Sequence, residues 1–189
     1  MSLSQEAKKL AGKLLTPIRV GDRKLAPVKV QAPPTPGVHL SSTSFPEWGE
    51  IPARYSGEAG ISPELSWDDV PSGTKELAIL CEDPDAPMPR PFVHWVLYGL
   101  SPAARELPEG MSRTVLTGGA IEGKSSAGTL GFMGPKPPPG HGVHHYHFEL
   151  FALDEPAGLP PGADREALLK AMKGHVLSWG EVVGTYQVP

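Results

Sequence analysis

Glycine and proline interrupt this sequence so often that few of its segments can form long helices. The chain of 189 residues contains 22 glycines and 23 prolines, and both residue types favour turns. From Leu40 onward, short apolar runs alternate with turn clusters such as Ser62-Pro63 and Val70-Pro71-Ser72-Gly73. This rhythm is typical of an all-β domain with many short connections.

Length and charge limit the classes of function. A chain of 189 residues can form one domain with a full core or two small ones, and we expect one. The 17 basic and 21 acidic residues give a net charge of -4. No surplus of positive charge is available to neutralise nucleic acid phosphates or an anionic membrane surface. We therefore expect no nucleic acid partner.

The single cysteine and the early residues bear on location. Cys81 is the only cysteine, so no intrachain disulfide can form and the chain does not need an oxidising compartment. Residues 1–15 lack the uninterrupted apolar stretch of a signal peptide, and no run reaches membrane-spanning length. These features predict a cytoplasmic protein with no integral membrane segment.

Two neighbouring segments have the alternation of strands. Lys75–Glu82 carries apolar residues on both faces, which predicts a central strand. Asp83 follows Cys81 on one of these faces and is expected to point toward the core. In Phe92–Tyr98, strict alternation places His94 on the same face as Phe92, Val96 and Tyr98.

A third predicted strand, His144–Leu153, separates its histidines by face. His144 and Tyr146 share the face of the apolar residues Phe148 and Leu150, whereas His145 and His147 point the other way. The alternation therefore predicts that His144 and Tyr146 are available to a buried pocket, while the other two histidines are not.

Helices are expected near both ends of the chain. Gln5–Leu15 can form a short helix, and Asp164 can cap a helix from Arg165 to about Lys173. The apolar stripe of that second helix could continue through Val176, Leu177 and Trp179, followed by a closing strand from Val182 to Val188. Because Ala32 to Gly37 reads as an extended connector, we divide the chain into an N-terminal arm or extension, 1–39, and a main domain, 40–189.

Asp83 and Asp85 stand in a turn that prolines stiffen. Pro84 and Pro87 fix φ and remove backbone donors, so the turn can aim its carboxylates at an ammonium group or an imidazole. The alternative is that both aspartates only accept hydrogen bonds from nearby backbone amides, as aspartates in turns often do.

Imidazoles and a phenol complete the candidate site. His94 has apolar neighbours on its face, which predicts a desolvated, neutral ring. A lone histidine there would be a core residue, but His144 and Tyr146 add a second imidazole and a phenol that can donate to one oxyanion. Gly128, Gly131 and Gly134 lie in loops whose backbone amides could complete an anion nest.

Metal binding and nucleophilic catalysis are disfavoured. Since His144 points away from His145 and His147, the four histidines from His141 to His147 do not form one ligand set. The serines lack a nucleophile-elbow pattern, and Cys81 lies within a predicted strand. We expect no metal, no cofactor and no catalytic nucleophile.

Three segments together resemble one known family. Asp83-Pro84-Asp85-Ala86-Pro87, His94-Trp95 and Gly142-Val143-His144-His145-Tyr146 resemble the signatures of the phosphatidylethanolamine-binding protein family, also called the Raf kinase inhibitor protein family. The flanking Ser62 to Trp67 and Val183 to Tyr186 look like its bacterial and archaeal branch. The resemblance covers roughly Leu40 to Gln187.

The resemblance implies a β-sandwich with a few short helices and a small anion pocket at one end. It further implies that the pocket accepts phosphate, acetate or a phosphoethanolamine head group, and that its lining consists of Asp83, Asp85, His94, Pro137, Pro138, His144 and Tyr146. One departure is His145, which stands where the family's GxHRY signature has arginine, so a contact made by that guanidinium would be weaker or dependent on pH.

Two functions remain open at this point. The first is a non-enzymatic binding protein for an anionic or zwitterionic head group, which regulates a kinase or protease partner as the resemblance implies. The second is a small-molecule enzyme that uses His94 or His144 as general base on a phosphorylated or carboxylated substrate. A scaffold role for the front arm and a homodimer are also open, and no residue specifies the ligand.

Overall fold

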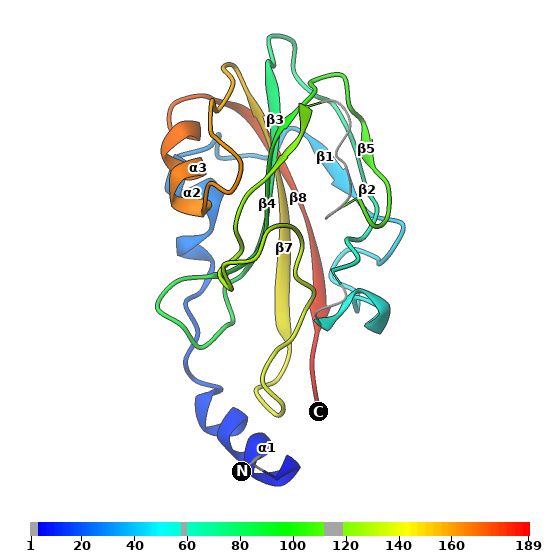
Figure 1. The fold of residues 1–189 in the computed structure, drawn as a ribbon, viewed down its shortest axis with the longest axis vertical. Helices are drawn as coiled ribbons and strands as arrows, with labels where there is room; N and C mark the ends of the chain where they lie inside the picture. The colour runs from blue at the N-terminus through cyan, green and yellow to red at the C-terminus, as the bar shows by residue number, and fades with distance from the viewer. Residues whose placement is uncertain (1–3, 58–59, 112–118) are drawn as a thin grey trace.

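We describe a computed structural model of the chain over residues 4–57, 60–111 and 119–189. Figure 1 shows an elongated molecule in which long strands run along the main axis and one helix lies beyond their lower end. The elements are, in order, α1 (Gln5–Leu15), the 3-10 helix η1 (Asp22–Lys24), α2 (Ala26–Val30), β1 (His39–Ser41), the 3-10 helix η2 (Ala53–Tyr55), β2 (Leu65–Asp68), β3 (Glu76–Asp83), β4 (Phe92–Leu100), β5 (Glu106–Leu107), β6 (Ile121–Glu122), β7 (His144–Leu153), α3 (Arg165–Met172) and β8 (Val176–Tyr186).

The larger sheet has five strands in the order β6-β4-β3-β7-β8, and all its neighbouring strands are antiparallel. Every residue of β3 is buried, as the apolar residues on both of its faces predict. The bounds of β7 agree with the sequence-based prediction, and those of β3 and β4 differ from it by one or two residues. Because β3 lies in the middle, its end brings the starts of β4 and β7 to one edge of the sheet.

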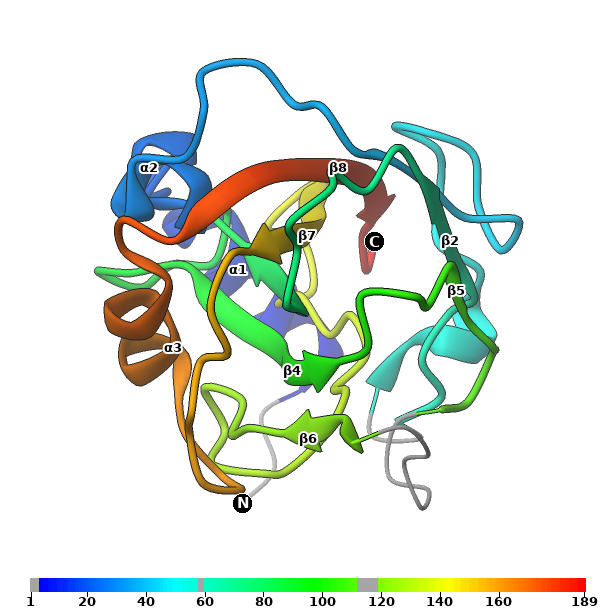
Figure 2. The same ribbon diagram turned by 90° about the horizontal axis from the view of Figure 1, so that it is seen from above.

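Two hydrophobic cores lie on opposite faces of this sheet. A smaller sheet, β1-β2-β5, covers one face, where Trp67 of β2 packs with Trp95 and Phe148 of the larger sheet. Helices α2 and α3 cover the other face through Val30, Leu168 and Met172. Figure 2 shows these layers end on, with the helices and the smaller sheet on opposite sides. The mainly β sandwich with a few short helices is confirmed.

Helix α3 forms where its cap predicts. The Asp164 side chain accepts a hydrogen bond from the backbone N–H of Ala167 at 2.9 Å, and the helix ends at Met172. Gly174 then adopts a φ of 86°, which reverses the chain. The predicted continuation of the apolar stripe through Val176 is therefore wrong, because β8 begins at that residue.

The first 39 residues contribute to packing as well as extending from the sandwich. Helix α1 agrees with its predicted bounds, but Leu10 and Leu14 are 61% and 72% exposed. Further along, Leu25, Ala26 and Val30 are buried, and the last two belong to the core under α2 and α3. Within the described residues, none of the helices combines the length and apolar character required to cross a bilayer.

Candidate functional site

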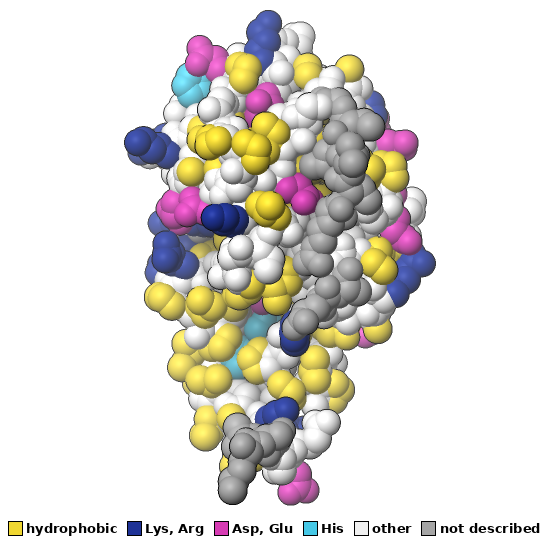
Figure 3. All heavy atoms as spheres, viewed as in Figure 1, with side chains coloured by type: hydrophobic (Ala, Val, Ile, Leu, Met, Phe, Trp, Pro, Cys, Tyr) yellow, Lys and Arg dark blue, Asp and Glu magenta, His cyan; other side chains and the backbone are white. Residues whose placement is uncertain are grey.

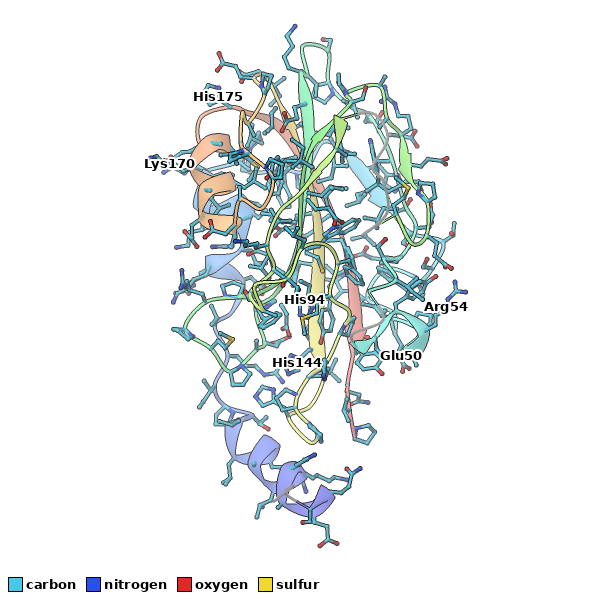
Figure 4. All side chains as sticks on the ribbon, in the orientation of Figure 1. Glu50, Arg54, His94, His144, Lys170 and His175 are labelled. Carbon is cyan, nitrogen blue, oxygen red and sulfur yellow. The ribbon has the colours of Figure 1, made fainter. Side chains whose placement is uncertain are left out.

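The predicted site residues come from strand ends that the sheet places side by side. Asp83 ends β3, His94 lies near the start of β4, and His144 begins β7. Since β4 and β7 both pair with β3 in the antiparallel sense, these ends meet at one edge. Figure 4 shows His94 and His144 close together near the lower end of β7.

A β-bulge turns His94 toward the site. Cys81 pairs with Trp95 and Glu82 pairs with Val93, so His94 is the extra residue between them. Val96 belongs to the core under the helices, whereas the His94 ring packs against Tyr146, with a centroid distance of 5.0 Å. The prediction that His94 shares the face of Val96 and Tyr98 is therefore wrong, because a bulge breaks the alternation on which it rested.

A cavity of about 220 Å³ lies at this edge of the sheet. We call it the histidine cavity; its lining residues are Asp83, Ala86, Pro87, Met88, Phe92, His94, Met133, Lys136, Pro137, Pro138, His144 and Tyr146. Six of the seven predicted residues are among them. Figure 3 shows a histidine surface within a largely apolar region in the lower half of the molecule.

Asp85 is the predicted residue that does not line the histidine cavity. Its carboxylate accepts hydrogen bonds from the His145 backbone N–H at 2.8 Å and the His145 Nδ1 at 2.6 Å, and it forms an ion pair with Arg19. Burial alone would raise the pKa of Asp85, but the hydrogen bonds from His145 and Arg19 outweigh it and the pKa is lowered. The described residues thus place Asp85 in a structural ion pair outside the cavity.

Arg19 brings a guanidinium to the turn from the N-terminal segment. Besides Asp85, it donates to the Val143 carbonyl at 3.0 Å. His145 stands where the GxHRY signature has arginine. In this chain, Arg19, from a different part of the sequence, contacts the same turn. Helix α1 docks nearby through Gly12, where an added Cβ would lie only 1.9 Å from the Pro139 carbonyl oxygen.

Asp83 and two histidines form a buried chain of hydrogen bonds. Asp83 Oδ2 lies 2.7 Å from His144 Nδ1, and His144 Nε2 lies 2.6 Å from His141 Nδ1. His141 Nε2 completes the chain at 2.8 Å from the carbonyl oxygen of Leu15. Asp83 also accepts from the backbone N–H groups of Asp85 and Ala86, so the turn fixes this carboxylate.

The protons of this chain can be counted. A carbonyl oxygen only accepts, so His141 Nε2 carries a proton, and with Asp83 ionised His144 Nδ1 carries another. The bond between the two rings requires a third proton. Two imidazoles with three protons carry one positive charge, which balances Asp83. The cluster is neutral overall, and both His144 ring nitrogens are already engaged.

His94 and Tyr146 are cavity residues with polar atoms that a ligand could contact. The His94 Nδ1 lies 2.7 Å from the Met133 carbonyl oxygen and therefore carries the proton of the neutral ring, which leaves a lone pair on Nε2. The hydroxyl of Tyr146, a residue only 1% exposed, is without a hydrogen-bond partner among the described residues. Burial lowers the pKa of His94 and raises that of Tyr146, so the ring is neutral and the phenol stays protonated at pH 7.

Several lining residues were missed from the sequence. Lys136 adds a basic group to the wall, and Phe92 and Met133 add apolar surface. A lysine between prolines was the available signal for Lys136, since the neighbouring Pro137 and Pro138 were predicted. The predicted nest of glycine amides is wrong for Gly128 and Gly134, because their N–H groups donate to the carbonyls of Ser125 and Gly57.

Comparison with family models finds a match over most of the chain. Residues 41–187 match the model described as phosphatidylethanolamine-binding protein. Among related sequences, a UPF0098 protein from Methanothermobacter thermautotrophicus is 43% identical over 152 residues, which cover 79% of this chain and 99% of that protein. A UPF0098 protein from Aquifex aeolicus is 41% identical over 152 residues, 79% of this chain and 88% of that protein.

Solved structures agree with this match. A phosphatidylethanolamine-binding protein homologue from Chlamydia trachomatis has 36% identity and a TM-score of 0.73, covering 82% of this chain and 100% of that chain. The YbcL protein of E. coli, described as a member of the mammalian family of such proteins, has 27% identity and a TM-score of 0.75, covering 81% of this chain and 99% of that chain.

Proposed function

Because this chain belongs to the phosphatidylethanolamine-binding protein family, we propose that it is a non-enzymatic binding protein whose histidine cavity takes a phosphate-type or phosphoethanolamine-like head group. The observation that carries this proposal is the Tyr146 hydroxyl. It is buried, it has no partner among the described residues, and it belongs to a cavity of about 220 Å³. A buried hydroxyl without a partner is costly, and a ligand oxygen would satisfy it.

The buried carboxylate of the cavity is compensated, so the cavity can accept an anion. The negative charge of Asp83 is matched by the shared proton of His141 and His144, so this cluster presents no net charge. Lys136 then adds positive charge to the lining. A phosphate-type oxyanion would therefore meet Lys136 and the Tyr146 hydroxyl without facing an uncompensated carboxylate.

The rest of the lining suits the substituent of a head group. Ala86, Pro87, Met88, Phe92, Pro137 and Pro138 are apolar, and a pocket with few polar groups among apolar ones binds small organic ligands well. Among the residues that the structure describes, the lining contains no serine, threonine or cysteine. Binding, and not covalent catalysis, is the function that this set of side chains supports best.

Tyr146→Phe is expected to lower the affinity for methyl phosphate about tenfold, because one hydrogen bond to a charged group is lost. The free energy of unfolding should change by less than about 1 kcal/mol, since the hydroxyl has no partner to lose. Titration calorimetry with inorganic phosphate, methyl phosphate and phosphoethanolamine measures the affinities. If none of them binds to the natural protein, or if Tyr146→Phe binds equally well, the proposal is wrong.

Anion affinity is expected to rise as the pH falls from about 8 to about 5. Burial lowers the pKa of His94, so its ring is neutral near pH 7 and Nε2 carries a lone pair, which repels an anion. Protonation of His94 at lower pH turns this atom into a donor. Sulfate is the appropriate probe because its own charge is constant over this range.

Calorimetry in two buffers with different ionisation enthalpies should then detect proton uptake when sulfate binds. The variant His94→Gln should bind sulfate with a flatter pH profile, which separates His94 from Asp83 and His144 in the same lining. An affinity that is constant or falls toward low pH would contradict the assigned role of His94.

A second candidate function is an enzyme that uses His94 as general base. The observation in its favour is a neutral, buried imidazole with an unprotonated Nε2 in a cavity lining. His144 is a poor base because both of its nitrogens are engaged. Screening of phosphoesters and carboxylic esters tests this: turnover that His94→Gln abolishes would favour catalysis, and no turnover would favour binding.

We further propose that the protein is cytoplasmic and that ligand binding regulates a protein partner, a kinase or a protease. We also propose that residues 1–39 form an extension of a main domain, 40–189.

Helix α1 contacts the loop before β7, so it lies near the histidine cavity. Deletion of residues 1–11 removes most of α1 but leaves in place Leu15, whose carbonyl contacts His141 Nε2, and the buried Leu25. Loss of partner capture in this variant would assign the contact to α1.

A further inference from the structure

A second cavity, of about 390 Å³, lies on the outer side of β7 and β8. We call it the indole cavity; its lining residues are Asp22, Leu25, Pro27, Val28, Gln31, Ala32, Pro33, Pro34, Trp48, His147, Trp179 and Glu181. The chain after α2 forms one wall, and Figure 2 shows this segment running outside β8 on its way to the smaller sheet. None of these residues lines the histidine cavity.

Two tryptophans give this cavity aromatic walls. Trp179 is fixed, because its Nε1 donates to the Pro33 carbonyl at 2.8 Å. Trp48 is 59% exposed, and its ring stands edge-on to those of His145 and His147, with centroid distances of 5.7 and 6.3 Å. Trp48 also has a φ of 59°, an unfavourable backbone conformation for a bulky side chain. An exposed indole at such a position favours a role in contact with a ligand.

The polar side of the cavity is acidic. Glu181 and Asp22 are in the lining, and burial together with the charge of Glu181 raises the pKa of the neighbouring Glu47. His147, only 5% exposed, places Nδ1 at 3.1 Å from the Glu181 carboxylate. Because the Glu181 carboxylate can only accept a hydrogen bond, the Nδ1 of His147 carries the proton. In the neutral ring, Nε2 is then bare, that is, without a proton. This Nε2 makes no hydrogen bond to the described residues.

We propose that the indole cavity binds an organic cation that carries N–H donors, an alkylammonium or a guanidinium group. Trp48 and Trp179 supply aromatic faces, which attract cations. Glu181 supplies the opposite charge, and the bare Nε2 of His147 accepts an N–H that a quaternary ammonium lacks. This inference concerns a site separate from the proposed head-group site and does not depend on it.

Titration of the full chain with N-acetyl-lysine methylamide and N-acetyl-arginine methylamide, followed by tryptophan fluorescence and calorimetry, tests the proposal. We expect saturable binding of one or both derivatives. The ratio of their two affinities shows whether the cavity prefers an ammonium or a guanidinium group. The neutral citrulline derivative and the trimethyl-lysine derivative should each bind at least about tenfold more weakly, because one lacks the charge and the other the donors. Equal binding of either derivative, or no saturation with the cations, would overturn the proposal.

Two variants localise the site. Trp48→Asn removes the indole and introduces asparagine, which tolerates the left-handed backbone at this position. Glu181→Gln removes the negative charge with little change in side-chain shape. Each should lower cation affinity at least about fivefold, while methyl phosphate affinity and the melting temperature stay unchanged. Glu106→Gln, an exposed acid on the smaller sheet, is the matched control and should bind like the natural protein. If Glu181→Gln binds the cations as tightly, the assignment is wrong.

Discussion

Arg165→Met is expected to lower the free energy of unfolding by about 3–5 kcal/mol, because it leaves a buried carboxylate without its counter-charge. Arg165 begins α3 and is 7% exposed, and its Nε donates to Glu82, a fully buried residue in the centre of the larger sheet. Its Nη2 donates to the Lys24 carbonyl at 2.6 Å. The substitution would therefore remove contacts that join both α3 and the N-terminal segment to the sheet at Glu82.

The surroundings of Glu82 offer little compensation for this loss. Its second oxygen accepts the backbone N–H of Ala26 at 2.7 Å. Burial, followed by the charge of Glu82, raises the pKa of the neighbouring Glu149 well above its ordinary value, which favours the neutral acid. Arg165 therefore provides the charge that balances Glu82.

Chemical denaturation measures the effect, and two further variants interpret it. Arg90→Met is the matched control, since Arg90 is an exposed arginine that lies 3.8 Å from the same Glu166 that Arg165 contacts; its loss should cost less than about 0.5 kcal/mol. The double variant Glu82→Gln with Arg165→Met should recover part of the stability. A loss below about 1 kcal/mol in the single variant would refute the buried-charge argument.

His144→Phe is the second variant for which we expect a large loss of stability, about 3 kcal/mol. The change leaves the Asp83 carboxylate, at a residue 3% exposed, without the positive charge of the histidine pair. It also removes the partner of His141 Nδ1. In a neutral, three-proton cluster, His144 therefore supports both the turn after β3 and the docking of Leu15.

Asp83→Asn separates charge from hydrogen bonding in this cluster. The asparagine amide can donate to His144 Nδ1, so the remaining two protons of the pair can donate toward His141 and Leu15 in turn. All three hydrogen bonds persist with neutral rings, and we expect a loss of about 1 kcal/mol or less. If this variant loses as much stability as His144→Phe, the proton count is wrong.

An exposed pair provides the control for this second prediction. His175 contacts Asp154 at 2.9 Å, a distance similar to that of the buried pair, but these side chains are 40% and 43% exposed. His175→Phe should therefore change the free energy of unfolding by less than about 1 kcal/mol. Nitrogen NMR of the histidine rings would in addition count the protons on His141 and His144 directly.

Local sequence signals predicted the regular elements well. Helix α1, the Asp164 cap and the whole of β7 follow from capping and alternation, which act over a few residues. The prediction that the apolar stripe continues after Gly174 was wrong because short apolar runs occur in both helices and strands. Pairing with β7 makes this segment a strand.

The sequence predicted which residues belong to the candidate site better than it predicted how they are arranged. Alternation placed His144 and Tyr146 correctly, but His94 reaches them through a bulge that depends on pairing with β3. Asp85 turned outward because Arg19 and His145 hold it, and Arg19 is 66 residues away in the sequence. The indole cavity likewise depends on where the first 39 residues dock, which no local pattern specifies.

A crystal structure of the full chain soaked with methyl phosphate would test the central claim most directly. We expect density for the phosphate group inside the histidine cavity, with one oxygen about 2.5–3.0 Å from the Tyr146 hydroxyl and another near Lys136. Density confined to other surfaces, or a cavity closed by its own apolar side chains at saturating ligand, would contradict the account.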